Sequence, residues 1–182
     1  MTAARPDDPA GSTTAAPLEA SLTVRLARLE DCEAIRAIYN VEVETSTATF
    51  DLVTRSLDDQ RAWLAARSGA FAAIVAVDGD AVIGFASLSP YKDRAAYSTT
   101  VEDSVYVDRR AAGQGVGTLL LTRLVDIARA SGFHAVMARI EASGGASRAL
   151  HAKCGFELVG IERQVGRKFN RWLDVAVMQR LL

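Results

Sequence analysis

The sequence feature that most constrains the fold is a glycine-rich turn between an alternating apolar segment and a leucine-rich segment. The stretch YVDRRAAGQGVGTLLLTRL runs from Tyr106 to Leu124. Gly113, Gly115 and Gly117 occupy every second position near its centre. Glycine loses much conformational freedom when it is ordered, so three of them indicate a sharp bend or a close approach to the backbone. The pattern predicts a strand, a tight turn and then a helix.

A phosphate-bearing ligand suits such a turn, because a helix N-terminus offers free amide groups at the positive end of the helix dipole. A tight strand-to-helix connection without a ligand is the alternative interpretation. A nucleoside triphosphate loop requires a lysine after its last glycine, whereas Thr118 follows Gly117. The dinucleotide fingerprint requires a glycine where Thr118 stands, but Glu141 ends the next predicted strand near the position of a ribose-binding acid. Four predicted strands precede the turn, which disfavours the dinucleotide interpretation.

Hydrophobic periodicity predicts one α/β domain over residues 22–182, behind a flexible polar tail of residues 1–21. Predicted strands cover residues 22–28, both arms of a hairpin within 71–91, and 98–108, 134–142, 157–166 and 172–182. Predicted helices lie within residues 29–44, 56–68, 115–133 and 145–156. The hairpin turns at Asp78-Gly79, and the helix after the glycine turn predicts a parallel crossover. The other connections allow antiparallel pairing, so we expect a mixed, mostly antiparallel sheet with helices on both faces.

Capping residues support the predicted helix boundaries. Asp31 is predicted to cap the first helix, and Ser56 or Asp58 the second. Gly132 and Gly155 directly follow the last two helices and are predicted to end them.

The composition argues against several classes of partner. The formal net charge of -1 gives no bulk attraction to nucleic acid or an anionic membrane, and no apolar run approaches the length of a membrane span. Only two histidines and two cysteines occur, in no clustered pattern, which disfavours a metal site. Cys32 and Cys154 are expected to be reduced thiols, which predicts a cytoplasmic protein. Residues 1–21 lack the pattern of a secretory signal.

Four segments carry a resemblance to a known family. They are TSTATF, TVEDSVYVDRRAAGQGVG, LHAKCGF and RWLDVAVMQ, in this order along the chain. With its mixed sheet and central glycine turn, the chain resembles the GNAT acyltransferases, and this resemblance covers about Leu22 to Leu182. In the four segments it is similar to one branch of that family, the phosphinothricin and methionine sulfoximine or sulfone N-acetyltransferases. The resemblance implies transfer of acetyl from acetyl-CoA to the α-amine of a small amino acid or analogue by a homodimer. Neither cysteine has an evident base beside it in the sequence, which favours direct transfer over an acetyl-enzyme.

The resemblance places acetyl-CoA along the strand and turn of the opening motif. It implies that the pantetheine arm pairs with the backbone of residues 105–107 and that the pyrophosphate binds the turn. The expected cofactor contacts are Val105, Tyr106, Val107, Gly113, Gln114, Gly115, Val116, Gly117, Thr118, Gly144, Ser147 and Lys153. Two positions depart from the family pattern, because Ala112 replaces a Gln or Arg and Gly144 replaces an Asn. Phosphate is then expected to bind backbone amides alone, unless Arg109 or Arg110 reaches it.

The resemblance assigns the general base to Glu102, just before the pantetheine strand. The ordinary glutamate pKa of about 4.3 makes a weak base, so burial or a relaying water molecule is required. A solvent-facing or ion-paired glutamate is the alternative. Asp103 points to the opposite face of the strand and is expected to be structural. His151 occupies the position of a thiolate-protonating tyrosine in many family members, and its role as acid, substrate contact or packing residue remains open.

The acceptor pocket is expected to combine an aromatic wall with cations. The expected substrate contacts are Phe50, Lys92, Arg94, Tyr97 and Glu102. Lys92 and Arg94 suit the carboxylate of an amino acid acceptor, and a solvated loop is the alternative interpretation. Phe169 and Trp172 are expected to close the pocket from a neighbouring subunit.

Two other functions are compatible with the sequence. One is a domain that binds CoA or an amino acid as a sensor, which the departures at Ala112 and Gly144 favour and the acid–base pair of Glu102 and His151 disfavours. The other is an acetyltransferase for a polyamine, an aminoglycoside or a protein N-terminus. Such acceptors would favour an acidic or open groove, against which the two predicted cations argue.

Overall fold

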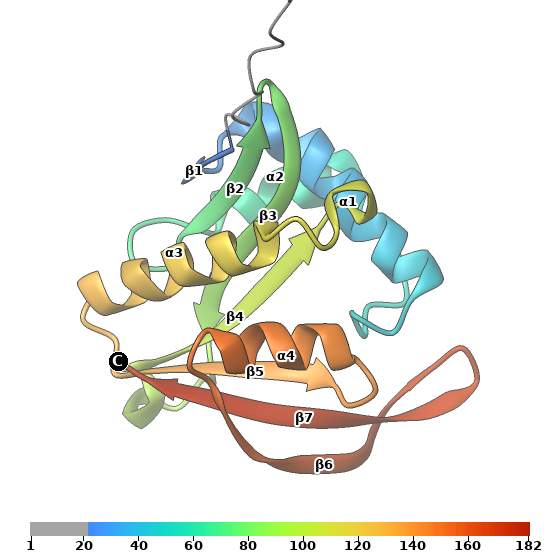
Figure 1. Cartoon of the computed structure of the whole chain (residues 1–182), viewed down its shortest axis with the longest axis vertical. Coiled ribbons are helices and arrows are strands. Elements are labelled where there is room, and N and C mark those ends of the chain that lie inside the picture. Colours follow the sequence, from blue (N-terminus) through green and yellow to red (C-terminus); the bar gives the residue numbers. More distant parts are fainter. Residues whose placement is uncertain (1–21) are drawn as a thin grey trace, which may run out of the picture.

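The structure is a computed structural model that describes residues 22–182, so the tail predicted for residues 1–21 lies outside the described residues. In the described part of the chain, seven strands form one sheet in the order β1-β2-β3-β4-β5-β7-β6 (Figure 1). The strands are β1 (Thr23–Leu26), β2 (Ala73–Asp78), β3 (Ala81–Pro90), β4 (Thr100–Val107), β5 (Ala135–Glu141), β6 (Glu157–Lys168) and β7 (Arg171–Leu181). Every neighbouring pair is antiparallel except β4 and β5, which are parallel. The predicted mixed sheet and its parallel crossover are confirmed.

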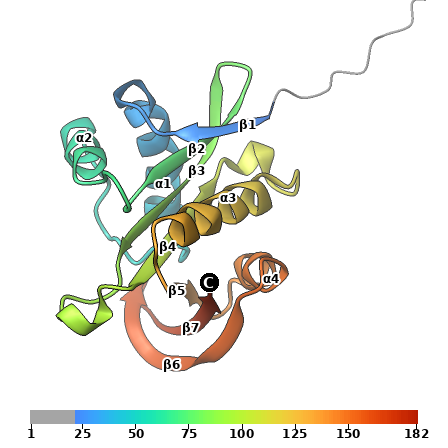
Figure 2. The same cartoon turned by 90° about the vertical axis from the view of Figure 1, so that its left-hand side faces the viewer.

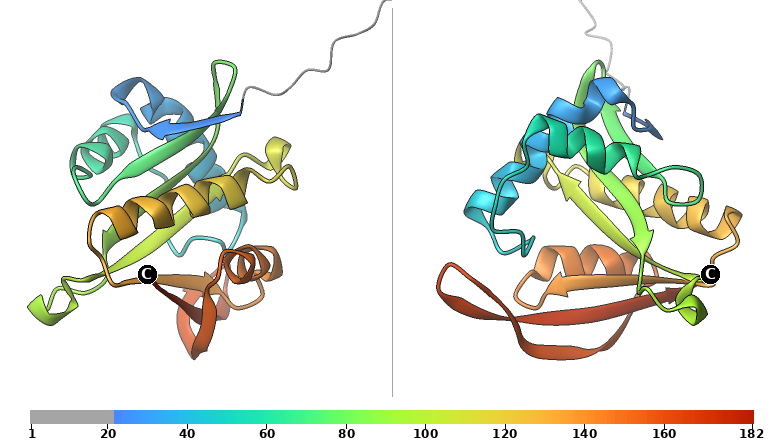
Figure 3. Two further views of the ribbon diagram at one scale, coloured as in Figure 1. Left: turned by 60° about the vertical axis from the view of Figure 1, so that its left-hand side comes forward. Right: turned by 180° about the vertical axis from the view of Figure 1, so that it is seen from behind.

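The α-helices of residues 22–182 cover both faces of this sheet, as predicted. They are α1 (Cys32–Thr45), α2 (Leu57–Ala65), α3 (Val116–Ala130) and α4 (Gly145–Lys153), and short 3₁₀ helices span Leu29–Asp31, Ala95–Tyr97 and Arg109–Ala111. Figure 2 shows α1 and α2 on one side of the sheet and α3 on the other. The rear view in Figure 3 shows α1 and α2 in front of the strands. None of the helices described here is long and apolar enough to span a membrane.

Most of the predicted capping signals are confirmed. The Ser56 hydroxyl accepts a hydrogen bond from the Asp59 N–H at 3.1 Å and caps α2. The prediction that the Asp31 side chain caps α1 is wrong. Its carboxylate accepts instead from the Arg25 guanidinium at 2.7 and 2.8 Å and from the Arg28 N–H at 2.7 Å. A charged donor in reach outcompetes a helix amide, because charge-assisted hydrogen bonds are stronger.

Two apolar clusters distinguish the two faces of the sheet. The larger cluster packs the leucines of α3 against β2, β3, β4 and β5. The smaller cluster packs α1 against the opposite face around Phe85. On β4, Val101 and Val105 belong to the larger cluster and Tyr106 to the smaller one. Because side chains alternate along a strand, odd-numbered residues of β4 face α3 and α4, and even-numbered residues face α1.

The two central parallel strands pair only briefly and then separate. Thr100–Glu102 of β4 pairs with Ala135–Met137 of β5. Beyond these residues β4 continues to pair with β3, but β5 has moved away and pairs with β7. One edge of β4 is therefore open in the middle of the sheet, and this opening positions the site.

Candidate active site

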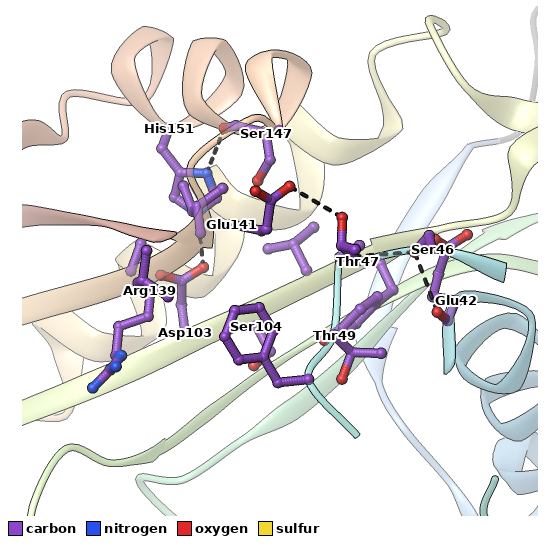
Figure 4. Close-up of a pocket in the computed structure, with 18 of the residues that line it drawn as sticks. Glu42, Ser46, Thr47, Thr49, Asp103, Ser104, Arg139, Glu141, Ser147 and His151 are labelled. Atoms are coloured by element: carbon purple, nitrogen blue, oxygen red, sulfur yellow. Dashed lines mark hydrogen bonds and ion pairs between the residues drawn. The ribbon is translucent and has the colours of Figure 1, made fainter. Parts of the chain in front are cut away.

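A cavity of about 520 Å³ lies where β4 and β5 separate. Strands β4 and β5, helix α4 and the loop after α1 line it (Figure 4). Of the predicted site residues, the lining includes Phe50, Glu102, Val105, Tyr106, Gly144, Ser147 and His151. It also includes polar residues absent from the predicted site: Glu42, Ser46, Thr47, Thr49, Asp103, Ser104, Arg139, Glu141 and Ser143. The structure thus brings the predicted base, the predicted histidine and the predicted pantetheine strand to one cavity.

The open edge of β4 presents backbone hydrogen-bonding groups. The Asp108 N–H donates to the Ile83 carbonyl at 2.8 Å, so this amide points toward β3. Backbone direction alternates along a strand, and the N–H groups of Val105 and Val107 therefore point toward the side that β5 has left. An extended ligand that carries amide groups can pair with this edge as an added strand.

The glycine-rich turn adopts backbone conformations that favour glycine. Gly113 and Gly115 have φ angles of +78° and +84°, and α3 begins directly afterwards without a side-chain cap. The first amide groups of α3 are thereby left for a ligand, as an anion site at a helix N-terminus requires. Gly117 has a packing role, because a Cβ there would meet the Leu150 side chain of α4 at 3.0 Å.

The two arginines before this turn already have protein partners. Arg109 donates to Glu42 at 2.8 Å, and Arg110 pairs with Asp108 at 2.6 Å. Neither guanidinium therefore replaces the side chain missing at Ala112 unless it gives up an ion pair. In this structure the turn offers a ligand its backbone amides.

Glu102 lies where β4 and β5 part, on the sheet face that α1 covers. Burial raises the pKa of Glu102, and the Arg139 guanidinium opposes this shift. The charges of Asp103 and Glu162 add to the increase, and the pKa lies above its ordinary value. A raised carboxylate pKa is the change that a general base needs in order to work near neutral pH.

Asp103 and His151 form a buried ion pair on the opposite face of β4. The His151 Nε2 lies 3.1 Å from the Asp103 Oδ2, and the two side chains are 4% and 1% exposed. The His151 Nδ1 lies 2.7 Å from the Ser147 carbonyl oxygen (Figure 4). Both ring nitrogens thus face oxygen acceptors, and an imidazole that donates to both must carry two protons. Asp103 faces away from Glu102, as predicted, and it also holds His151 in place.

The surroundings of His151 favour its charged form. Desolvation lowers the pKa of His151, but the hydrogen bond and charge of Asp103, together with the Ser147 carbonyl, raise it above its ordinary value. The Phe156 ring packs against the imidazole at 5.1 Å between centroids. Both protons of the imidazolium are committed to the protein, which favours a fixed cation over a mobile proton donor.

The loop after α1 forms one wall of the cavity and is held by three elements. The Thr47 hydroxyl donates to Glu141 of β5 at 3.0 Å (Figure 4). The Tyr39 hydroxyl of α1 lies 2.8 Å from the Thr49 hydroxyl. The buried Lys168 of β6 donates to the Thr49 carbonyl at 2.8 Å, and desolvation lowers the pKa of its ammonium. Strands far apart in the sequence thus fix this wall.

The predicted cations are not brought to the cavity. Lys92, Arg94 and Tyr97 line a separate depression together with Tyr91 and Asp93. The Lys92 ammonium lies over the Tyr91 and Tyr97 rings, 4.7 and 5.1 Å from their centroids. Within one chain this loop supplies no charge to the cavity.

Other predicted residues also lie outside the cavity lining. Lys153 is exposed at the end of α4, and Gln114 is exposed and donates to the Arg110 carbonyl. Val116 is buried in the core beneath the turn, and Thr118 is half-buried in the first turn of α3. The aromatic residues predicted to close a neighbouring pocket, Phe169 and Trp172, are 52% and 63% exposed.

Some of the missed residues had a signal in the sequence. Asp103 lies between Val101 and Val105 on the helix-covered face of a strand, where a carboxylate requires a partner. Thr47 and Thr49 belong to the TSTATF segment, from which only the aromatic residue was predicted to line the pocket. On β5 the sequence marked Glu141 only as a ribose-binding acid, and no comparable signal marked Arg139.

The fold and the site together define a class of protein. It combines an open central strand, a half-buried glutamate on that strand and a glycine turn that leads into a helix N-terminus. The family model described as "Acetyltransferase (GNAT) family" matches residues 34–156, which is more than half of the chain. The chain therefore belongs to the GNAT family and is an N-acetyltransferase.

Individual relatives narrow this assignment to one branch. The chain is 38% identical to the phosphinothricin N-acetyltransferase of Streptomyces coelicolor over 170 residues, which is 91% of this chain and 99% of that protein. It is 40% identical to the L-methionine sulfoximine/L-methionine sulfone acetyltransferase of Pseudomonas paraeruginosa over 161 residues, 87% of this chain and 94% of the relative. A GNAT phosphinothricin acetyltransferase from Sinorhizobium meliloti, solved in complex with acetyl-CoA, superposes with a TM-score of 0.85 at 38% identity and covers 88% of each chain. The predicted resemblance to this branch is confirmed.

Proposed function

We propose that this enzyme transfers acetyl from acetyl-CoA to the α-amine of a small amino acid or analogue of the phosphinothricin, methionine sulfoximine or methionine sulfone type. One observation carries the proposal: the half-buried Glu102 stands where β4 opens, next to the free backbone edge of Val105 and Val107. The names of the relatives support this class of acceptor.

The groups present fit acetyl-CoA. Val105 and Val107 offer the pantetheine amides a strand edge, and the turn at residues 113–115 leads into the free amides of α3 for the pyrophosphate. Gly144 supplies no side chain, and a Cβ there would meet the Glu141 carbonyl at 3.0 Å. A side chain at this position, where family members often carry an asparagine, would therefore crowd the backbone of the turn before α4.

In the proposed reaction Glu102 accepts the proton of the acceptor ammonium, directly or through water. The amine nitrogen then bonds to the thioester carbon while the carbon–sulfur bond breaks, and the second proton that the nitrogen loses passes to the CoA thiolate. An N–H on the open edge of β4, at Val105, stabilises the negative charge that develops on the carbonyl oxygen. Among the described residues, Cys32 and Cys154 are buried away from the cavity lining, which supports direct transfer without an acetyl-enzyme.

We propose that His151 supports this reaction as a fixed cation. An imidazolium at the cavity wall favours negative charge on the departing thiolate, because opposite charges interact strongly where water is largely excluded. The Asp103 carboxylate and the Ser147 carbonyl hold its two protons, so His151 need not release one.

We further propose that the enzyme is a cytoplasmic homodimer. Exposed apolar side chains lie on β6, on β7 and in the turn between them, namely Val159, Ile161, Val165, Phe169 and Trp172. A second subunit would cover this surface, and the two free thiols suit a reducing compartment. Light scattering of the full chain should give the mass of two chains, and a single-chain mass at micromolar concentration would overturn the dimer.

The aromatic wall of the acceptor site provides a first prediction. A Cβ at Gly166 of β6 would come within 2.2 Å of the Phe50 ring, so the Gly166→Ala variant must displace this ring. We expect the KM for the acceptor to rise about 10- to 100-fold, because small displacements of positioning groups have large effects. The KM for acetyl-CoA should stay near the wild-type value in initial-rate measurements.

Gly160 of the same strand offers the matched control, since a Cβ there meets no atom within 4 Å. Gly160→Ala should leave both KM values unchanged. An unchanged acceptor KM in Gly166→Ala would show that Phe50 does not line the acceptor site.

A panel of amines tests the proposed function. Release of CoA thiol from acetyl-CoA should be fastest with phosphinothricin, methionine sulfoximine or methionine sulfone, and slower with spermidine, an aminoglycoside and a peptide N-terminus. Clear CoA binding without turnover of any amine would instead identify a sensor.

A further inference from the structure

Lys168 is a buried cation that no step of the proposed reaction uses. It ends β6 and is 4% exposed, and within residues 22–182 no carboxylate forms an ion pair with it. Its ammonium donates to the Thr49 carbonyl at 2.8 Å and to the Glu42 carbonyl at 3.4 Å. Lysine is almost never fully buried without a partner, because removing an ammonium from water is costly. The two carbonyl oxygens are thus the groups that compensate for this burial.

The two carbonyl groups belong to the two ends of one short segment. The Glu42 carbonyl lies in the last turn of α1, where the negative end of the helix dipole favours a cation. The Thr49 carbonyl lies beyond the bend that follows this helix. Ser46, Thr47 and Ala48 lie between the two and line the cavity. The ammonium therefore fixes the distance between the ends of the segment that forms this wall.

The end of the β6–β7 hairpin brings Lys168 to the wall. A two-residue turn, Phe169-Asn170, directly follows Lys168, and its φ angles of +48° and +59° are positive, as a tight hairpin turn requires. Figure 1 and Figure 3 both show this turn on the side of the molecule where α1 ends. The short turn keeps the two strands paired up to Lys168, so the ammonium is carried by an ordered hairpin.

The same face of β6 also supports the aromatic residue of the wall. Gly166 lies two residues before Lys168, so both positions face the wall. The Phe50 ring occupies the place of a side chain at Gly166, since a Cβ there would come within 2.2 Å of it. Phe50 directly follows Thr49, so the hairpin holds two neighbouring residues of the wall. Loss of the Lys168 contact would therefore loosen the aromatic ring as well as the threonine beside it.

We infer that Lys168 is a positioning residue that sets the affinity for the acceptor by holding the wall of residues 46–50 in place. The inference rests on the proposed function, in which this wall faces the acceptor. Lys168 is not part of the cavity lining, so it acts on the acceptor through Thr49 and Phe50. A methionine of similar length fills the same space but offers the two carbonyl groups no donor.

Calorimetry on the CoA-saturated enzyme tests the inference independently of turnover, with methionine sulfone as the probe. Lys168→Met is expected to raise the Kd for methionine sulfone about 10-fold, because small displacements of positioning groups have large effects. The Kd for acetyl-CoA should stay near wild type, and initial rates should show the same difference between the two KM values. Amide hydrogen exchange in residues 46–50 should become faster. Arg123→Met, at an exposed cation of α3, is the control and should change none of these.

Lys168→Arg is a milder change that keeps the test decisive if the methionine variant does not fold. It retains a cation with hydrogen-bond donors, but the guanidinium is larger and planar, so it should shift the wall and raise the Kd for methionine sulfone several-fold. A Kd for methionine sulfone near wild type in every folded variant would overturn the inference. An equal loss of affinity for acetyl-CoA would also overturn it, since a general structural role would weaken both ligands alike.

The outcomes separate the inference from the proposed function. A wild-type enzyme that binds methionine sulfone but releases no thiol would refute the proposed turnover. A selective loss of methionine sulfone binding in Lys168→Met would then leave the role of Lys168 standing. A wild-type enzyme that binds no methionine sulfone would overturn the proposed acceptor and the inference with it.

Discussion

Replacing Glu102 by glutamine is expected to lower kcat by about 10²- to 10⁴-fold, the usual contribution of a positioned general base. Glutamine keeps the shape of the side chain but cannot accept the ammonium proton. The Kd for acetyl-CoA should stay near wild type, because the proposed contacts to CoA are backbone groups of β4 and the glycine turn. Stopped-flow or initial-rate assays measure kcat, and CoA titration measures the Kd.

The pH dependence of kcat/KM tests the assignment of Glu102 as the base further. Burial raises the pKa of Glu102 above its ordinary value, so the acid limb of kcat/KM should lie above about pH 4.3. Activity falls as the pH drops through this pKa, because the protonated carboxyl cannot act as a base. Glu102→Gln should lack the limb, and Glu157→Gln, at an exposed glutamate of β6, should retain it. Wild-type turnover by Glu102→Gln across the whole pH range would show that another group is the base.

Removing the Asp103 carboxylate is expected to cause the largest loss of stability. Asp103→Ala leaves the His151 imidazole buried without its partner, and breaking one side of a buried pair costs about 3–5 kcal/mol of unfolding free energy. Asp126→Ala is the control, since Asp126 pairs with Arg129 at the surface at 3.4 Å and such pairs contribute about 0–1 kcal/mol. Urea unfolding measures both variants. A similarly small loss in each would show that the buried pair does not anchor α4 to β4.

The direction in which pH changes the unfolding free energy follows from the raised pKa of His151. The pKa of His151 is raised in the folded state, so the protonated form stabilises the fold. This contribution to stability is fully present below about pH 6.5, the pKa of an unperturbed histidine. It is lost as the pH rises through the higher pKa that His151 has in the folded state. Asp103→Asn removes the charge but keeps the shape, and it should remove this pH-dependent loss. In NMR titrations the His151 ring should lose its proton at lower pH in Asp103→Asn than in wild type, and an unchanged or higher midpoint would contradict the ion pair.

Local sequence patterns predicted the fold well because its elements are encoded locally. The hairpin at Asp78-Gly79, the cap at Ser56 and the left-handed Gly132 and Gly155 all depend on neighbours within a few residues. The wrong cap at Asp31 shows the limit of such reasoning, since its carboxylate is taken by Arg25, which no local rule selects.

A backbone pattern and the family resemblance were enough to select Glu102, which lines the cavity, and the glycine turn, which leads into α3. Their roles in binding and catalysis stay predictions. Long-range partners were not predictable. The pairing of Asp103 with His151 joins residues 48 positions apart, and that of Lys168 with Thr49 joins residues 119 apart. Such contacts depend on how β4, α4 and β6 are placed in space, which periodicity alone does not specify.

We propose that this chain acetylates an amino acid amine directly within a complex that also holds acetyl-CoA. Mass spectrometry after a single turnover of the full chain with acetyl-CoA and methionine sulfone distinguishes direct transfer from an acetyl-enzyme. We expect methionine sulfone acetylated on its α-nitrogen and a protein of unchanged mass, with or without the acceptor. An acetylated protein that forms before the acceptor is added, or the absence of the acetylated amino acid, would contradict it.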